Sequence, residues 1–291
     1  MVCAAVRGWC PARPQTPPTI PTTRRSDVNE PSANLMLRAW AAERQLFGTW
    51  ATLPSPVSAE FMAREGADYV CVDNQHGLID HSDTVPMLAA IEAGGSVPIV
   101  RTQWNDPPRI MAALDAGAAG VIVPMVNDAE EARRAAESCR FPPRGMRSYG
   151  PTRARYVMGT TDPDGLNDVV CIVMVETADG LENLDEIVTT EGIDAVYIGP
   201  SDLALGVGQK PGPRPYDDLA EPLGLIRAAC RRHGVAVGIH ALNGDAAARY
   251  AEDGYDMITV GADASLLAGA VATALRTARG SGAGPGARAG G

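Results

Sequence analysis

Short apolar runs alternate with longer stretches of helical periodicity along most of the chain. Eight of these runs are rich in valine, isoleucine and other strand-forming residues, and they begin at Phe47, Tyr69, Val97, Gly120, Val169, Ala195, Val235 and Met257. Several are almost continuously apolar, which is typical of parallel strands that are buried on both faces. The pattern therefore predicts eight buried strands.

A segment with helical periodicity follows each predicted strand. Many of these segments end in glycine just before the next strand, where a left-handed C-cap is common. Asp128 and Ser58 are expected at N-caps or in first helical turns. Eight βα units in order, with no glycine-rich dinucleotide fingerprint after the first strand, favour a closed (β/α)8 TIM barrel over a doubly wound sheet.

Both ends of the chain differ from this alternating pattern. Residues 1–35 are rich in proline, threonine and arginine, and residues 279–291 are rich in glycine, so we predict disordered extensions flanking a barrel over 36–278. Arg7 interrupts the first short apolar run, which argues against a signal peptide. A transit peptide and a true start at Met36 are both left open.

Composition limits the partners and the compartment. The formal net charge of -10 argues against nucleic acid and against anionic membrane surfaces. No apolar run approaches the roughly 20 residues that span a bilayer. None of the six cysteines has zinc-like spacing, and Cys71 and Cys171 fall in apolar runs. We expect a cytoplasmic protein with reduced thiols.

Lys210 is the one lysine of the chain, and it lies in a stretch rich in glycine and proline. Schiff-base chemistry needs a desolvated lysine held against a carbonyl group. A lysine in such a loop is expected to be solvated. Carbonyl chemistry in this protein is therefore expected to use a metal.

Polar residues end several of the predicted strands. In a TIM barrel the active site lies at the C-terminal ends of the strands. The residues found there are Asp73, Asn74, Gln75, His76, Arg101, Glu176, Ser201, Asp202, His240 and Asn243. Carboxylates on two neighbouring strands, Glu176 and Asp202, suit a hard divalent cation that keeps several waters.

Each of these residues also has a purely structural interpretation. Glu176 and Asp202 could favour helix N-termini. His76 could be a packed histidine, and Arg101 could belong to a surface ion pair. Spacing alone does not decide between the two interpretations.

At these residues the sequence resembles the HpcH/HpaI aldolase family of class II pyruvate aldolases, which includes enzymes for 4-hydroxy-2-oxoheptanedioate and 2-dehydro-3-deoxyglucarate. The resemblance covers about 37–276. It rests on FGTW, VDNQHG, VPIVRTQWNDP, VIVPMVNDAEEA, FPPRGMRSYG, VMVET, YIGPSDLA and ITVGADASLLA. The barrel would be of the pyruvate/phosphoenolpyruvate superfamily type.

The resemblance implies reversible aldol cleavage of a 2-oxo-4-hydroxy acid to pyruvate, or a close 2-oxo acid, and an aldehyde. It implies Mg²⁺, Mn²⁺ or Co²⁺ as cofactor and a homohexamer, a trimer of dimers with exchanged C-terminal helices. Catabolism of aromatic compounds or sugar acids is the implied setting. The implied roles are metal binding by Glu176 and Asp202, catalysis by His76, Arg101 and Asp115, substrate binding by Met174, Gly199, Pro200 and Ser201, and support by Asp73.

Three positions fit the family pattern poorly. Met174 and Gln75 replace a glutamine and a glutamate that the family often has, which makes the pocket less polar and puts a dicarboxylic substrate in doubt. Asp115 ends a predicted helix, at the barrel face opposite the expected site, so either the helix projects or a neighbouring subunit supplies the contact. An acyl-CoA lyase of the citryl- or malyl-CoA type and a non-catalytic barrel subunit are the alternatives.

Overall fold

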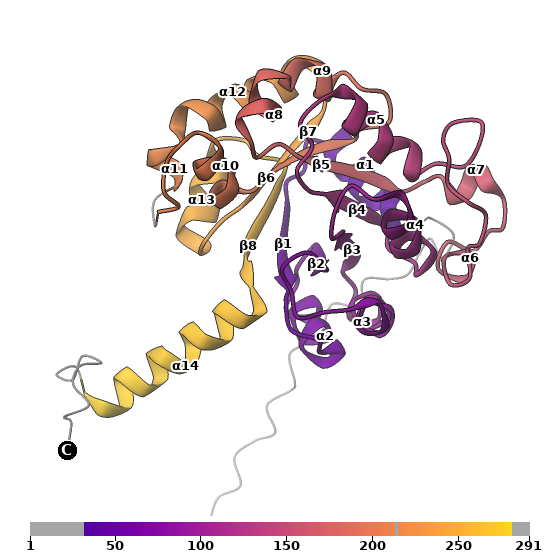
Figure 1. Cartoon of the computed structure of the whole chain (residues 1–291). Coiled ribbons are helices and arrows are strands. Elements are labelled where there is room, and N and C mark those ends of the chain that lie inside the picture. The colour runs from indigo at the N-terminus through magenta and orange to yellow at the C-terminus, as the bar shows by residue number, and fades with distance from the viewer. Residues whose placement is uncertain (1–31, 213–214, 281–291) are drawn as a thin grey trace, which may run out of the picture.

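A strand forms at each of the eight predicted apolar runs, and the strands close into a barrel (Figure 1). The computed structural model describes residues 32–212 and 215–280. Neighbouring strands are all parallel and follow one another in sequence order. They are β1 Leu46–Ala51, β2 Tyr69–Asp73, β3 Val97–Arg101, β4 Gly120–Val123, β5 Val170–Met174, β6 Ala195–Ile198, β7 Ala236–His240 and β8 Met257–Ala262. The predicted (β/α)8 TIM barrel is confirmed.

Side chains along each strand point alternately into the barrel and toward the helices, and this alternation separates two apolar cores. Side chains such as Tyr69, Cys71 and Ile172 fill the barrel interior, whereas Val70 and Val72 face the surrounding helices. This period of two follows from the strand pleat. The last inward positions of the strands therefore reach the top of the barrel, where Asp73 and Arg101 are register partners.

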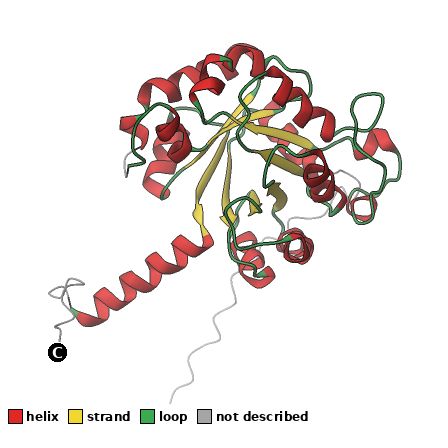
Figure 2. Cartoon of the chain, in the orientation of Figure 1, coloured by secondary structure: helices red, strands yellow, loops and turns green. Residues whose placement is uncertain are grey.

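Helices surround the strands (Figure 2). The outer helices are α2 Pro56–Arg64, α3 His81–Gly94, α4 Pro107–Asp115, α5 Ala129–Ser138, α8 Ala178–Glu182, α9 Leu184–Val188, α12 Ala220–His233 and α13 Gly244–Glu252. One predicted helix is divided into α8 and α9. Asp128 caps α5 by accepting the N–H of Glu131 at 2.8 Å, and Ser58 lies in the first turn of α2. Both placements agree with the sequence prediction.

The bottom of the barrel is closed by a helix that the sequence pattern did not predict. Helix α1 spans Ser32–Ala41. Its Met36 and Ala39 belong to the interior core, together with Leu46 and Val97 at the starts of strands. The helix begins before Met36, and the rest of the predicted extension over 1–35 lies outside the described residues, as do 281–291.

A long irregular segment lies between α5 and β5, and it carries the short helices α6 Ala154–Val157 and α7 Pro163–Leu166. Phe141, Ala154 and Leu166 form a small core of their own. None of the described helices is long and apolar enough to cross a membrane.

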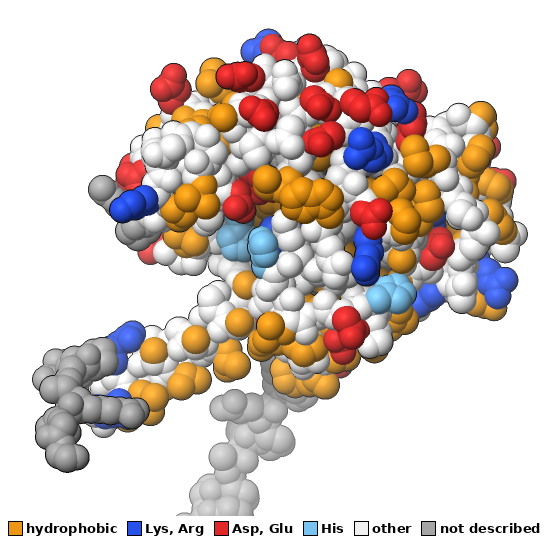
Figure 3. All heavy atoms as spheres, in the orientation of Figure 1, with side chains coloured by type: hydrophobic (Ala, Val, Ile, Leu, Met, Phe, Trp, Pro, Cys, Tyr) orange, Lys and Arg blue, Asp and Glu red, His pale blue; other side chains and the backbone are white. Residues whose placement is uncertain are grey.

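The last helix, α14 Asp263–Arg279, extends away from the barrel (Figures 1 and 2). Asp263 is its one buried residue, and its carboxylate accepts hydrogen bonds from the Thr52 N–H at 2.8 Å and the Thr52 hydroxyl at 2.6 Å. Apolar side chains lie along the exposed remainder of the helix (Figure 3), and the largest are Leu266, Leu267, Val271 and Leu275. The helix is thus fixed to its own barrel only at its start.

Candidate active site

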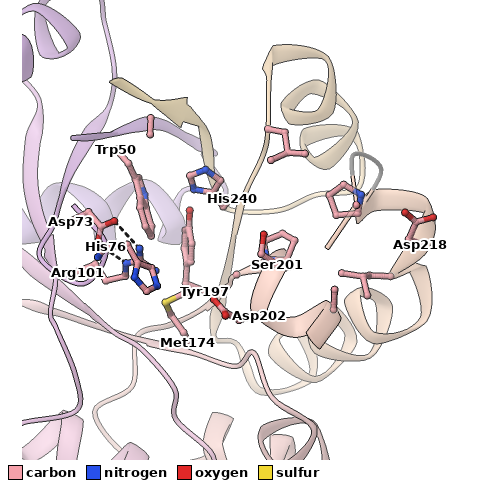
Figure 4. A pocket seen from close by; sticks show the side chains of 18 of the residues that line it. Trp50, Asp73, His76, Arg101, Met174, Tyr197, Ser201, Asp202, Asp218 and His240 are labelled. Atoms are coloured by element: carbon pink, nitrogen blue, oxygen red, sulfur yellow. Dashed lines mark hydrogen bonds and ion pairs between the residues drawn. The ribbon is translucent and has the colours of Figure 1, made fainter. Parts of the chain in front are cut away.

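A pocket of about 240 Å³ opens at the C-terminal ends of the strands (Figure 4). It brings together most of the side chains that the sequence placed in the site. Those that line it are Asp73, His76, Arg101, Met174, Gly199, Pro200, Ser201 and Asp202. Glu176 lies directly behind Gly199, and Asp115 does not reach the pocket.

Glu176 follows β5 and is almost completely buried. Its Oε1 accepts the N–H of Met125 at 3.0 Å, whereas its Oε2 is buried and has no hydrogen-bond partner among the described residues. Burial raises the pKa of the carboxyl to about 7; the Met125 N–H lowers it, nearby Asp202 raises it and Arg101 lowers it. An acid in this position needs a positive partner to stay ionised.

Backbone geometry brings Glu176 close to the pocket. A side-chain Cβ at residue 199 would overlap Oε2 and would lie 2.9 Å from Met174 Cε. Glycine is required there by this close approach, since its φ of -95° is ordinary. Met125, whose N–H holds Oε1, has a φ of 57°, a conformation that a non-glycine residue rarely adopts.

Asp202 lies in the first turn of α10 Pro200–Gly206. The N-cap of this helix is Gly199, so Asp202 is not the capping residue, although an acid in the first turn favours a helix N-terminus. No third histidine, cysteine or acid joins Glu176 and Asp202 in the part of the chain that the structure describes. Two carboxylates, one with an unpartnered buried oxygen, fit a hard cation whose other ligands are waters or substrate oxygens.

Arg101 and Asp73 form a buried ion pair across β3 and β2. The guanidinium donates from Nε to Oδ1 at 2.9 Å and from Nη2 to Oδ2 at 2.7 Å, and it stacks over Trp50 at 4.3 Å from the ring centroid. Burial alone would lower the Arg101 pKa, but the hydrogen bonds and charge of Asp73 outweigh it and raise the pKa. Arg101 is therefore a fixed cation in the pocket wall and not a surface residue.

Asp73 also organises the loop that carries His76. Its Oδ1 accepts the backbone N–H groups of Gln75 at 3.1 Å and His76 at 3.2 Å. The His76 imidazole is exposed at the pocket and has no hydrogen bond to a described residue (Figure 4). It is free to meet a substrate.

The structure does not place Asp115 beside His76 of its own chain. Asp115 is the last residue of α4, whose C-terminus faces the start of β4 at the bottom of the barrel. Its Oδ1 accepts a hydrogen bond from Nη2 of buried Arg147 at 2.8 Å. Lys210 is exposed, as predicted, and lines the outer part of the pocket.

Trp50 and Tyr197 also line the pocket, and the sequence analysis did not name them. His240, which the sequence analysis found at a strand end without giving it a role, lines the pocket too. Trp50 stacks on Tyr197 with ring centroids 5.6 Å apart, and it forms a T-shaped contact with His240 whose ring centroids are 5.0 Å apart. All three occupy inward positions near strand ends. The period of two could have identified Trp50, the last inward residue of β1, and Tyr197, which faces inward near the end of β6.

The fold and the site define a barrel protein whose chemistry lies at the C-terminal strand ends, around two carboxylates, a histidine and an arginine. The model of the HpcH/HpaI aldolase/citrate lyase family matches residues 46–270, and the chain belongs to this family. The predicted resemblance is confirmed.

Relatives of known name are similar over most of their length. A hydroxypyruvate/pyruvate aldolase of Rhizorhabdus wittichii is 39% identical over 84% of this chain and 99% of its own. A 4-hydroxy-2-oxo-heptane-1,7-dioate aldolase of Klebsiella pneumoniae is 39% identical over 84% of this chain and 93% of its own. The crystal structure of a family protein from Burkholderia cenocepacia superposes with a TM-score of 0.78, at 34% identity, over 85% of this chain and 100% of the other.

Proposed function

We propose that this protein is a divalent-metal-dependent aldolase that reversibly cleaves a 2-oxo-4-hydroxy acid to pyruvate, or a close 2-oxo acid such as hydroxypyruvate, and an aldehyde. The observation that carries the proposal is the buried, unpartnered Oε2 of Glu176 near Asp202, at the edge of a pocket that also presents His76 and Arg101. The names of the relatives support the reaction class.

The residues of the pocket account for each step of the proposed aldol cleavage. Glu176 and Asp202 would hold Mg²⁺, Mn²⁺ or Co²⁺, which when bound supplies Lewis acidity to the keto group of the substrate. Arg101, kept charged by Asp73, stabilises the negative charge that develops on the keto oxygen. His76 takes the proton of the hydroxyl group whose C–C bond breaks. Gly199, Pro200 and Ser201 border the substrate carboxylate.

Removal of metal should test this function directly. With pyruvate and a panel of aldehydes, EDTA should lower the aldol rate by roughly a hundredfold or more, since a Lewis acid contributes several kcal/mol. Added Mg²⁺ or Mn²⁺ should restore it. Borohydride should not trap pyruvate on the protein, because exposed Lys210 is the one lysine. Activity that survives EDTA would contradict the proposal, and tight binding of coenzyme A would favour an acyl-CoA lyase.

We further propose a homohexamer, a trimer of dimers, in which α14 is exchanged between barrels. The exposed leucines and valine of α14 form a stripe that its own barrel leaves uncovered, and such surfaces commonly mark protein contacts. A neighbouring chain is also the remaining source of an Asp115 contact for His76, because the Asp115 of the same chain is remote from the pocket.

Substitution of Met174 tests which 2-oxo acid the enzyme prefers as the donor of the aldol reaction. It is the register partner of Tyr197 and lines the pocket, on the same side of β5 as Glu176. A thioether fills apolar volume but is a poor hydrogen-bond partner, which favours a donor bulkier or less polar than pyruvate. Met174→Gln should shift the kcat/KM ratio between 2-oxobutanoate and pyruvate toward pyruvate by a few-fold to about tenfold, or about 1 kcal/mol. Met174→Leu should leave the ratio near that of the wild type. An unchanged ratio in Met174→Gln would contradict a role of Met174 in selecting the donor.

A further inference from the structure

His240 is a second histidine of the pocket, and the proposed reaction does not use it. It ends β7, beside Thr259 of β8, and its ring forms a T-shaped contact with Trp50 (Figure 4). The imidazole is half-buried and lines the pocket. It has no hydrogen bond to any residue between 32 and 280 that the structure describes.

Among the described residues, the wall around His240 holds one other side-chain polar group without a hydrogen-bond partner, the Nε1–H of Trp50, and that nitrogen is buried and not exposed to a substrate. This wall is formed by β1, β6, β7 and β8 and comprises Trp50, Thr52, Tyr197, His240, Leu242 and Ala262. The Thr52 hydroxyl is already bonded to Asp263, and the Tyr197 hydroxyl is bonded to Thr259 at 2.5 Å. Leu242 and Ala262 present aliphatic groups, and Trp50 presents its ring.

The charge state of His240 follows from its surroundings. Burial lowers its pKa to about 4; the nearby Arg101 cation also lowers it, and Asp73 raises it. At neutral pH the ring is therefore uncharged and presents one N–H donor and one nitrogen acceptor. A hydroxyl group, which both donates and accepts, is a natural complement to such a ring, whereas a carboxylate would find only one donor.

We propose that His240 is a specificity-determining residue that binds a hydroxyl group on the carbon chain of the substrate. This inference rests on the proposed aldolase function. When a substrate displaces water from the ring, an analogue with a methyl group in place of that hydroxyl leaves the imidazole nitrogens unpaired. Sites built to bond a hydroxyl reject such analogues more strongly than apolar pockets reject an extra group.

The hydroxyl could belong to the 2-oxo acid donor or to the aldehyde acceptor, and matched pairs of nearly equal size distinguish the two. For the donor, 3-hydroxypyruvate is compared with 2-oxobutanoate. For the acceptor, glycolaldehyde is compared with propanal. The wild-type metal-loaded enzyme should prefer the hydroxylated member of one pair by roughly tenfold in kcat/KM.

Two variants then locate the preference at His240. His240→Leu should abolish it by lowering kcat/KM for the hydroxylated member alone, and His240→Gln, which keeps a donor and an acceptor, should retain most of it. Loss of preference in the donor pair places the hydroxyl on the 2-oxo acid, and loss in the acceptor pair places it on the aldehyde.

The inference fails if the wild type shows no hydroxyl preference in either pair. This result does not depend on whether any variant folds. It also fails if His240→Leu, folded by circular dichroism, keeps the wild-type ratios. A wild-type enzyme that forms no aldol product with any of the four compounds, or with pyruvate and the wider aldehyde panel, would instead overturn the proposed function and this inference with it.

Discussion

Glu176→Ala and Asp202→Ala should each abolish divalent-cation binding and aldol cleavage while the barrel stays folded. Glu176 is a buried carboxylate whose Oε2 lacks a partner, so its removal relieves an unfavourable burial and leaves only the Met125 N–H without its acceptor. Asp202 makes no capping bond that its loss would break. Titration calorimetry with Mn²⁺ and thermal melting of each variant would measure the two properties separately.

A matched control is available on a neighbouring helix. Glu182 is an exposed glutamate at the end of α8, and Glu182→Ala should keep both the binding heat and the turnover of the wild type. If Glu176 and Asp202 only favoured helix N-termini, their alanine variants would lose about 1 kcal/mol of stability and keep activity. That pattern would contradict the metal site.

Asp73→Ala should destabilise the protein and inactivate it together. The substitution leaves the Arg101 guanidinium buried without its bidentate partner, and breaking a buried ion pair in this way costs about 3–5 kcal/mol. It also releases the backbone of His76 from its acceptor. We expect kcat/KM to fall by at least about a hundredfold, comparable with the loss of one transition-state hydrogen-bond donor. Denaturant unfolding and steady-state kinetics check the two effects.

An exposed ion pair with the same N–O distance serves as the control for this prediction. Arg133 and Glu130 on α5 are joined at 2.7 Å, but both side chains are about half exposed. Glu130→Ala should cost less than about 1 kcal/mol, because solvent screens an exposed pair. Equal unfolding free energies for Asp73→Ala and Glu130→Ala would show that the buried pair has no special role.

The strands and the main site residues were predictable because they depend on local pattern. Buried parallel strands are apolar along their whole length, so each run stood out in the sequence. Glu176, Asp202, His76 and Arg101 are polar residues directly after such runs, and barrel geometry brings those points together. Their placement in one region needed no knowledge of side-chain contacts.

Other features depend on tertiary contacts that a local pattern does not contain. Helix α1 closes the barrel because Met36 and Ala39 pack against interior residues of the strands, which are distant in sequence. Residue 199 must be glycine because Glu176, which is distant in sequence, lies against it in the fold. Asp115 matches the family pattern, but within a single chain it lies at the bottom of the barrel, opposite the pocket.

The attachment of α14 at Asp263 has a consequence for how the chain unfolds. Beyond its first residue the helix buries no described side chain, so packing against its own barrel contributes little to its stability. Helix and barrel should then belong to different cooperative units, with the helix opening at a far lower free energy than the strands. Only a neighbouring molecule could merge the two units, which would make amide protection of this helix depend on protein concentration.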